Sequence, residues 1–570
     1  MAKNILSLNH KKALEFFMST SNYTTLETPE YIDMSSLLKN VRKNLGSTEF
    51  KHCLKSDPRY IKNLNYSLYV NKDGKQAIRP ITLVNPYIYY FFVREICTKD
   101  NWNFIKFWFH NMQIPTITVC SFPVIAEKSE AFHKATTVLN WWNNFEQGSL
   151  NLSLEYPYMF VSDIRNCYGT IKPEIIKEAL NYVSDKNNTV TIDESSKTKI
   201  ETPVNKNFMD LLRLFQGDLI IGLPQGNALS DFLAEIVLAY ADMLFYKAII
   251  QQGLNCKYKV LRYRDDYRIF CNDLEGLKQI SYVLQNVLLQ LNFDLNSQKT
   301  KYSDDLITNS IKGDKLAYIY NTPIFNKKGC DFDGIQKHLL FIRQFGKQYP
   351  NSGQLKTLLS DLSVRLDQKI NPDDFPTTSI EEDLLDQLDE DFDSIQEDIK
   401  KAESQEENIF KKLKVFPTPK YNVIKEDFRP IIAIATQISI ENVTCCHYAL
   451  RVISQLLAIC NNKQKKEITA LIVKRILDLP NNEYLQIWLQ AMTYLMDKKR
   501  KDSPYTNRIC KIVMGANIEL WNTEWLKEDL TKGIPQSCIC NKNKLSKAKS
   551  IIRFKERDSY LETSKVIYKL

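Results

Sequence analysis

The front of the chain alternates short runs of period-two hydrophobicity with runs of helical spacing. Apolar and polar residues alternate over 66–70, Asn71-Lys72-Asp73-Gly74 has turn composition, and residues 77–81 alternate again, which predicts a β-hairpin. Helical spacing of apolar residues follows at 87–96 and again at 131–145. Strands and helices mixed in this way predict an α+β fold.

A second block continues with strand, helix, hairpin and helix. A strand ends at Asp163, and Pro173 opens a helix at a first-turn position, where proline loses no hydrogen bond. The apolar runs 258–261 and 267–271 flank a short polar turn and predict a second β-hairpin, which a helix over 276–291 follows.

The pattern changes near residue 350. A proline-containing segment and a strongly acidic run at 381–407 separate the front from a back portion with helical periodicity. The acidic run is either a solvated helix or linker, or a mimic of nucleic acid. Amphipathic helices are predicted at 431–440, 447–459, 465–477, 483–496 and 507–514. Paired helices of this sort stack into α-repeat arrays, in which Trp488, Trp521 and Trp525 are expected to be core anchors.

Composition limits the class of protein. A chain of 570 residues with 44% hydrophobic and 25% charged residues predicts a globular protein of two or three domains. The net charge of +9 is compatible with a phosphate-bearing partner, and the last residues, 542–569, are mostly basic. The longest apolar stretch, 232–250, is interrupted by Glu235, Asp242 and Lys247, so it predicts a buried or amphipathic helix and no membrane contact.

Cysteine usage and the amino terminus indicate the cellular compartment of the protein. The 13 cysteines have no repeating spacing, and no apolar signal core precedes the first predicted helices. Reduced thiols in a cytoplasm are therefore expected. The abundance of Asn, Lys and Ile is typical of an AT-rich genome and suggests a bacterial source. Six histidines without an H-E-x-x-H arrangement count against a zinc hydrolase, and the lack of a G-x-x-x-x-G-K-[ST] sequence excludes a P-loop ATPase.

The most informative residues are Tyr263-Arg264-Asp265-Asp266, in the turn of the second hairpin. Adjacent carboxylates in a turn hold divalent cations, although Asp-Asp is also a common solvated pair. Two further segments precede it: Phe160-Val161-Ser162-Asp163-Ile164-Arg165-Asn166-Cys167-Tyr168 and Gly222-Leu223-Pro224-Gln225-Gly226-Asn227-Ala228-Leu229-Ser230. In this order and at these intervals, the three segments resemble motifs A, B and C of the reverse transcriptase palm.

The resemblance covers about residues 60–345 and implies a fold, a reaction and cofactors. The fold would be a right-hand polymerase fingers and palm, followed by the all-α repeat region. The reaction would be nucleotidyl transfer with two Mg²⁺ ions, for which Mn²⁺ would substitute. Asp163 and Asp265 would bridge both ions, Asp266 would lie nearer the attacking hydroxyl, and the backbone carbonyl of Ile164 would complete the site.

The same resemblance implies roles in binding deoxynucleoside triphosphates. Tyr168, five residues after Asp163, would be the steric gate that clashes with a 2′-hydroxyl; the alternative is a tyrosine that only closes a strand-to-helix corner. Gln225 would hydrogen-bond the template or nucleotide, and Gly226 would let the backbone approach the base pair.

Three basic residues complete the set that the resemblance implies. Lys72 and Arg79, on the first hairpin, would close over the triphosphate. Lys299, in the motif D position, would donate a proton to the departing pyrophosphate. The sequence also departs from the common pattern: Arg264 stands where many reverse transcriptases carry an apolar or small residue, and Arg165-Asn166-Cys167 replaces a more apolar run.

Segments of the back portion indicate which group of reverse transcriptases the chain resembles. The segments Glu483-Tyr484-Leu485-Gln486-Ile487-Trp488-Leu489-Gln490, Pro504-Tyr505-Thr506-Asn507-Arg508-Ile509-Cys510 and Ile518-Glu519-Leu520-Trp521-Asn522 resemble the C-terminal region of bacterial abortive-infection and defence-associated reverse transcriptases, as does Ser121-Phe122-Pro123. This implies an antiphage enzyme and a homo-oligomer, with DNA made without a template and attached covalently to the protein.

Two other functions stay open at this point. One is a retron-like enzyme that copies a dedicated noncoding RNA. The other is a catalytically silent nucleic-acid-binding scaffold for defence. The expected domains are fingers and palm over 1–350, an acidic linker or helical connector over 351–428, and an α-helical repeat with a basic tail over 429–570.

Overall fold

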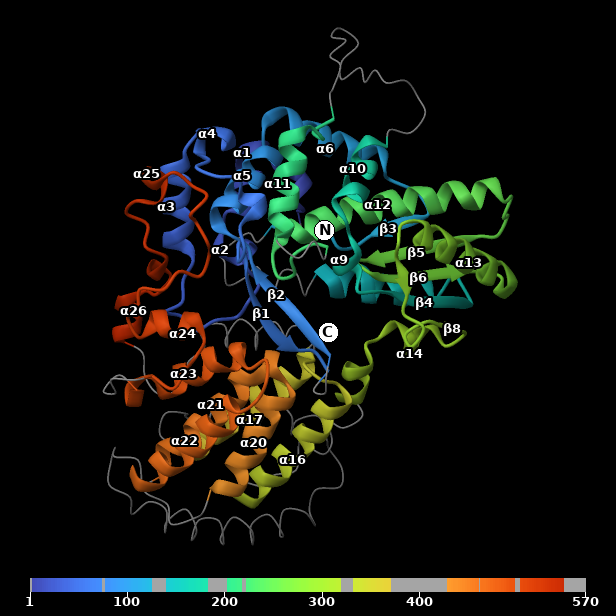
Figure 1. The fold of residues 1–570 in the computed structure, drawn as a ribbon. Coiled ribbons are helices and arrows are strands. Elements are labelled where there is room, and N and C mark those ends of the chain that lie inside the picture. Colours follow the sequence, from blue (N-terminus) through green and yellow to red (C-terminus); the bar gives the residue numbers. More distant parts are fainter. Residues whose placement is uncertain are drawn as a thin grey trace, which may run out of the picture.

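The structure is a computed structural model, in which an α+β front portion lies beside a layer of helices (Figure 1). It describes residues 3–73, 77–125, 140–182, 202–217, 222–318, 332–370, 428–460, 462–497 and 503–547. Four of the regions predicted above lie wholly or partly outside these residues: the hairpin turn at Gly74, the helix at 131–145, the acidic run at 381–407 and the basic tail.

Short helices and one hairpin form the first part of the molecule. The helical elements are η1 (Ile5–Ser7), α1 (His10–Phe17), α2 (Thr20–Tyr23), α3 (Ser35–Leu45), α4 (Phe50–Cys53), η2 (Pro58–Tyr60), α5 (Pro86–Ile96) and α6 (Lys99–Asn111). Strands β1 (Tyr66–Asn71) and β2 (Ile78–Leu83) pair antiparallel, which confirms the predicted hairpin. Figure 1 shows this hairpin reaching from the front portion to the helical layer.

A mixed sheet of six strands lies at the centre of the second block. Its strands are β3 (Ile117–Val119), β4 (Tyr158–Arg165), β5 (Tyr258–Tyr263), β6 (Asp266–Cys271), β7 (Asp294–Leu295) and β8 (Lys301–Ser303). The order is β3-β5-β6-β4-β7, with β8 also paired to β4, and only β3 and β5 are parallel. The associated helices are η3 (Trp142–Glu146), α8 (Gln147–Leu152), α9 (Cys167–Thr170), α10 (Pro173–Asn181), α11 (Lys206–Gln216), α12 (Ala228–Gln251), α13 (Leu274–Gln290) and α14 (Leu306–Ser310).

Both faces of the sheet are buried. Successive side chains of a strand point to opposite faces, so neighbouring residues report on the two faces separately. Val260 and Ile269 belong to the main hydrophobic core. Their neighbours Leu261 and Phe270 belong to a second, smaller cluster with Phe145 of η3. The central hairpin is therefore fixed from both sides.

A buried arginine ties the central hairpin to α12. The guanidinium of Arg262 donates to Asp242 Oδ2 at 2.8 Å and to Glu235 Oε2 at 3.0 Å, and all three side chains are at most 3% exposed. Tyr267 Oη donates to the second oxygen of Asp242 at 3.0 Å, and Ser121 Oγ donates to Glu235. Charges buried this deeply are tolerated because each carboxylate has a cation and a hydroxyl as partners.

The helical layer contains both predicted and unpredicted helices. The helices α20 (Arg429–Glu441), α21 (Cys446–Ile459), α22 (Asn462–Leu477), α23 (Glu483–Asp497) and α24 (Arg508–Val513) confirm the five that the periodicity predicted, and η5 (Val443–Cys445) precedes α21. Two earlier helices, α16 (Phe332–Gln348) and α17 (Gly353–Ile370), pack against α20 and α21.

The helical layer also holds the tip of the β1–β2 hairpin through Asn351. The amide nitrogen of Asn351 donates to the carbonyls of Asn71 and Lys72 at 3.3 and 3.0 Å. Its amide oxygen accepts from the backbone and hydroxyl of Thr444, both at 2.9 Å, and its backbone N–H donates to Asn442. Asn351 has φ +58°, a conformation that asparagine adopts more readily than most residues.

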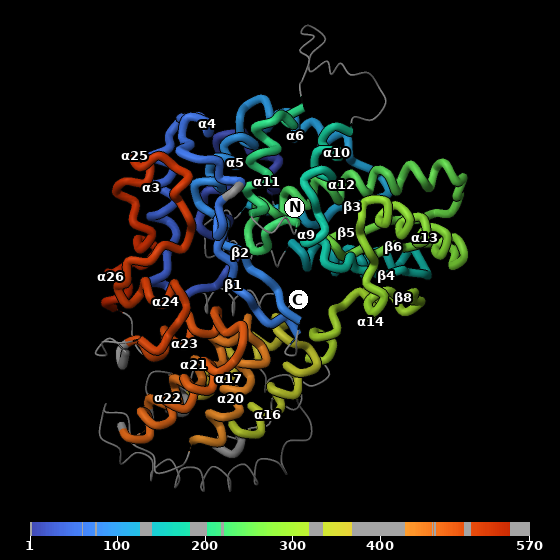
Figure 2. The backbone as a smooth tube through the Cα atoms, in the orientation of Figure 1, coloured from blue at the N-terminus to red at the C-terminus, as the bar shows by residue number. Residues whose placement is uncertain are grey.

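The last described segment returns to the front portion. It contains α25 (Glu528–Thr531), η6 (Gln536–Ile539) and α26 (Lys542–Ser546), which Figure 2 shows beside the amino-terminal helices. Trp521 Nε1 donates to the carbonyl of Leu83 at 2.9 Å. Trp488, Trp521 and Trp525 are at most 3% exposed, so their predicted burial is confirmed, but Trp521 and Trp525 lie in loops and the helical setting predicted for them is wrong.

None of the helices in the described residues has the length and apolar content to span a membrane.

The buried cluster around Arg262 generates a stability prediction. Arg262→Met keeps most of the side-chain volume but leaves the Glu235 and Asp242 carboxylates without their cation. We expect the free energy of unfolding in urea to fall by about 3–5 kcal/mol. The loss should grow as pH rises above the ordinary carboxyl range, because unpaired buried carboxyl groups keep their protons in the folded state and lose them on unfolding.

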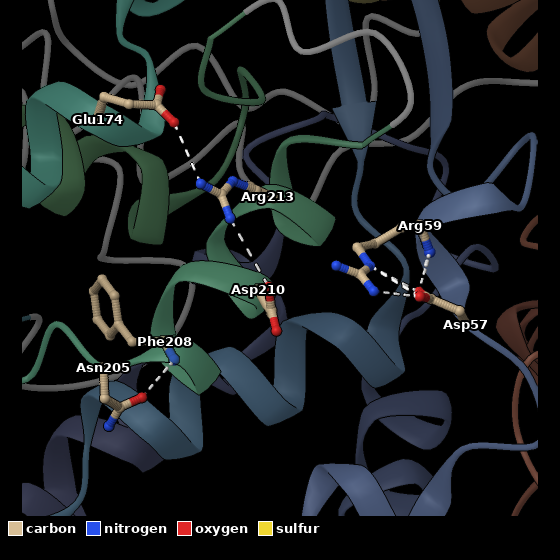
Figure 3. A network of polar contacts seen from close by, with 7 residues as sticks. All are labelled: Asp57, Arg59, Glu174, Asn205, Phe208, Asp210 and Arg213. Atoms are coloured by element: carbon tan, nitrogen blue, oxygen red, sulfur yellow. Dashed lines mark hydrogen bonds and ion pairs between the residues drawn. The ribbon is translucent and has the colours of Figure 1, made fainter.

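A matched arginine on the surface provides the control (Figure 3). Arg213 lies 3.4 Å from Glu174 and 3.9 Å from Asp210, and its side chain is 49% exposed. Arg213→Met should change the free energy of unfolding by about 0–1 kcal/mol, because solvent screens exposed pairs. Equal losses in the two variants would contradict a special role for the buried cluster.

Candidate active site

Strand pairing brings the three predicted carboxylates together. Asp163 in β4 is the register partner of Asp266 in β6, and Asp265 is in the turn before Asp266. The backbone N–H of Ile164 donates to the carbonyl of Asp265 at 3.0 Å, which joins the turn to β4. The Asp163 side chain is nearly buried, and Ile164 is fully buried.

The turn between β5 and β6 has only two residues, Arg264 and Asp265, between the paired Tyr263 and Asp266. Arg264 adopts φ +55°, which costs a non-glycine residue about 1–2 kcal/mol. Two contacts hold this conformation. Arg262 Nη1 donates to the Arg264 carbonyl at 3.3 Å, and the Arg264 guanidinium donates to Asp231 Oδ2 at 2.6 Å.

The carboxylates repel one another. Burial, followed by the charges of Asp265 and Asp163, raises the pKa of Asp266 to about 7. Burial and the Asp163 charge also raise the pKa of Asp265 above its ordinary value. Burial and mutual repulsion therefore both disfavour negative charge at this site.

Lys299 and Asn296 compensate part of this charge. Lys299 Nζ lies 3.0 Å from Asp163 Oδ2, and the Asn296 side-chain amide donates to the same oxygen at 3.3 Å. The Lys299 side chain is 59% exposed. The lysine predicted for the motif D position thus contacts a predicted metal ligand.

The donor set suits a hard divalent cation. Three carboxylates, two on the paired strands β4 and β6 and one in the adjoining turn, supply the hard oxygen ligands that Mg²⁺ prefers. Within the described residues, no three or more His, Cys, Asp and Glu side chains meet as a preformed metal cluster. Instead, Asp163 is bonded to Lys299 and Asn296, so a metal ion at this carboxylate would compete with the lysine.

Tyr168 contacts the loop that precedes α12. The backbone N–H of Leu223 donates to the Tyr168 carbonyl at 2.8 Å. Gly222 has φ +83°, and a Cβ added there would lie 2.1 Å from the same carbonyl oxygen, so only glycine permits this approach. Tyr168 Oη donates to Asp231 Oδ1 at 2.6 Å, and burial together with the Asp231 charge raises the pKa of Tyr168.

Gln225 and Gly226 lie between the β1–β2 hairpin and α12. The Thr82 N–H of β2 donates to the Gln225 carbonyl at 3.0 Å, and Gly226, with φ +103°, accepts from the Thr25 N–H at 2.8 Å. Asn227 caps α12 through its side chain, which accepts from the Ser230 N–H. The loop before α12 is thus held by the hydrogen bonds from Thr82 and Thr25 and by the Asn227 cap.

Lys72 and Arg79 are exposed on the β1–β2 hairpin. The backbone N–H of Lys72 donates to the Ala77 carbonyl at 2.7 Å, and Arg79 pairs with Val70. No hydrogen bond or ion pair between described residues joins either side chain to the three carboxylates. Their role over a triphosphate remains a prediction of the sequence.

Sequence reasoning missed the residues that support the site. These are Asp231, Glu235, Asp242, Arg262 and Asn296. A signal was present for the two buried acids, because Glu235 and Asp242 interrupt an otherwise apolar helix at a seven-residue spacing. A carboxylate in such a position needs a buried cation, and Arg262 in the next strand is that cation.

Among the comparisons with known proteins, the match to a protein family agrees with this geometry. Residues 110–335, less than half of the chain, match the family described as reverse transcriptase (RNA-dependent DNA polymerase). This match contains β4, the loop before α12 and the β5–β6 hairpin. No curated protein is similar enough in sequence to match the chain.

Solved structures with detectable similarity include telomerases. Apo telomerase of Candida tropicalis truncated from the C-terminal domain shares 13% identity, with a TM-score of 0.26, over 42% of this chain and 49% of that chain. Telomerase of Candida albicans in complex with a TWJ fragment of telomeric RNA shares 12%, with a TM-score of 0.25, over 77% and 68%. Apo telomerase of Candida tropicalis shares 12%, with a TM-score of 0.27, over 84% and 78%.

This chain thus spans about half of the truncated telomerase. The likeness to these structures is too weak to define partners or substrates. The family match carries the identification, because it covers the strands that bring Asp163 beside Asp265 and Asp266. Residues 110–335 of this chain form a reverse transcriptase domain, whose family is that of the RNA-directed DNA polymerases.

Proposed function

We propose that this protein is a divalent-metal-dependent DNA polymerase of the reverse transcriptase class that acts in antiphage defence. The observation that carries the proposal is the pairing of Asp163 with Asp266, with Asp265 beside them in the turn. Three acids gathered at adjoining strands and their turn, with the pKa values of Asp265 and Asp266 raised by burial and by neighbouring carboxylates, suit a polymerase metal site.

Mg²⁺ ions bound there would stabilise the charge that builds on the attacking and leaving oxygens. Asp163 and Asp265 would bind both ions, Asp266 would lie nearer the attacking hydroxyl, and the Ile164 carbonyl would complete the site. Mn²⁺ fits the same oxygen ligands and is expected to replace Mg²⁺. Lys299, once free of Asp163, would donate a proton to the leaving pyrophosphate.

The residues around Tyr168 would bind the deoxynucleoside triphosphate. The Tyr168 ring would exclude a 2′-hydroxyl, and the fixed Gln225–Gly226 loop would support the base pair. Lys72 and Arg79 would approach the phosphates from the β1–β2 hairpin. Their exposure leaves both cations free of competing buried contacts.

The defence role rests on the resemblance of the helical region and of Ser121-Phe122-Pro123 to bacterial defence-associated reverse transcriptases. Ser121 Oγ donates to Glu235, one of the buried partners of Arg262. By the same resemblance the protein would form a homo-oligomer in the bacterial cytoplasm and carry a covalently attached DNA product. A bound noncoding RNA would mark the retron-like alternative.

Removing one charge from the acidic site should abolish synthesis. Asp163→Asn and Asp265→Asn keep side-chain volume but lose a metal ligand, so incorporation of labelled deoxynucleotide should fall about a thousandfold or more. Thermal unfolding should change little, because the carboxylates repel one another in the native state. Asp294→Asn, an exposed acid on β7, is the control and should stay active. A folded Asp265→Asn protein with full activity would reject the site.

Lys299 should compete with the metal ion for Asp163. In Lys299→Ala, Mn²⁺ measured by electron paramagnetic resonance should bind roughly threefold to tenfold more tightly, because a neighbouring positive charge is removed. Turnover should fall in the same variant. Lys301→Ala is the matched control, since Lys301 lies two residues on and bonds Asn309. Unchanged Mn²⁺ affinity in Lys299→Ala would argue against competition at Asp163.

A protein-primed product should remain attached after purification. Protein taken from cells, treated with nuclease and protease and analysed by mass spectrometry, should yield a peptide with nucleotide on a hydroxyl side chain. Asp265→Asn protein treated identically should yield none. Co-purification of a discrete RNA with untethered DNA would favour the retron-like alternative.

A further inference from the structure

Asp231 joins side chains from two of the predicted motifs and directly follows the third. It lies in the first turn of α12, directly after the loop with Gln225 and Gly226. One of its oxygens accepts from Tyr168 Oη and the other from Arg264 Nη2, both at 2.6 Å. The nucleotide side of the site and the metal-binding turn are therefore connected through one carboxylate.

The position of Asp231 is itself fixed. Asn227 caps α12, and the Asp231 N–H donates to the Asn227 carbonyl at 3.3 Å. A carboxylate in the first helical turn also interacts favourably with the helix dipole. Its side chain is 16% exposed, and both of its bonds are short and charge-assisted, which makes them stronger than neutral hydrogen bonds.

Regular secondary structure alone does not fix the side chains of Tyr168 and Arg264, the two partners of Asp231. Tyr168 lies in the short helix α9, which follows Asn166 at φ +50°, so its ring direction is set by contacts beyond a regular helix. Arg264 also has positive φ, and its long side chain begins one residue before Asp265. Without Asp231, the guanidinium would be free to contact the acidic site.

We propose that Asp231 is a positioning residue for sugar selection, which holds the Tyr168 ring in place and keeps Arg264 away from the three carboxylates. This inference rests on the proposed function, in which Tyr168 excludes the 2′-hydroxyl. It also gives Arg264, which departs from the usual motif C residue, a defined partner. Asp231 touches neither sugar nor metal and acts through its two neighbours.

The test compares dATP and ATP as substrates of the full-length protein, with kcat and KM measured separately. Tyr168→Ala removes the ring, Tyr168→Phe removes only the bond to Asp231, and Asp231→Ala removes both bonds. Asp231→Asn retains one acceptor oxygen for Tyr168. The control is Asp210→Asn on α11 (Figure 3), an acid with 25% side-chain exposure that lies 3.9 Å from Arg213.

We expect Tyr168→Phe and Asp231→Ala to lower the dATP preference about tenfold, equivalent to about 1.4 kcal/mol. The change should appear mainly as a lower KM for ATP. Asp231→Asn should recover part of the preference, and Asp210→Asn should match the wild type. The Tyr168→Phe, Asp231→Ala double variant should be no worse than Asp231→Ala alone, because the bond lost in Tyr168→Phe is already lost in Asp231→Ala.

Four results would each overturn part of this account. A wild-type protein that incorporates no nucleotide rejects the proposed polymerase. Unchanged preference in Tyr168→Ala rejects the gate. Relaxed preference in Tyr168→Ala, with normal preference in Tyr168→Phe and Asp231→Ala, rejects only the role of Asp231, as does an equal fall in kcat/KM for both nucleotides.

Discussion

The register between β4 and β6 is the constraint on which the site depends. In that register Asp163 faces Asp266, and the Ile164 N–H reaches the Asp265 carbonyl. A slip of one residue would turn the Asp163 side chain to the opposite face of the sheet. The alternation that buries Leu261 and Phe270 in one cluster and Val260 and Ile269 in the other resists such a slip. Hydrophobic packing thus fixes the geometry of three acids that repel one another.

The charged groups of the palm form two sets. The inner set surrounds the buried Arg262, and the outer set surrounds Asp163. In the inner set, Arg262 neutralises Glu235 and Asp242 and also binds the carbonyl of the catalytic turn. In the outer set, the side-chain partners of Asp163 among the described residues are the half-exposed Lys299 and the amide of Asn296. The inner charges are closed to solvent and stabilise the fold, whereas the outer set is partly open to solvent through the Lys299 side chain.

Local sequence pattern was sufficient for the hairpins, the long helix and the acidic turn. Their signals lie within about 20 neighbouring residues, the range over which hydrophobic periodicity operates. Partners from distant segments could not be predicted, such as Lys299 for Asp163 and Asp231 for Arg264. The helical assignment of Trp521 failed for the same reason, because its loop is shaped by the carbonyl of Leu83 in β2.

The contact of Asn351 with the Asn71 and Lys72 carbonyls has a mechanical consequence. A β-hairpin that is attached only at its base can move independently. This hairpin is also held near its tip, because Asn351 bonds Asn442 and Thr444 of the helical layer as well. Any closure of Lys72 and Arg79 over a bound triphosphate must either break these bonds or carry the helices along. If the hairpin closed in this way, the helical layer would restrain it, and Asn351 would be the residue that couples the two parts of the chain.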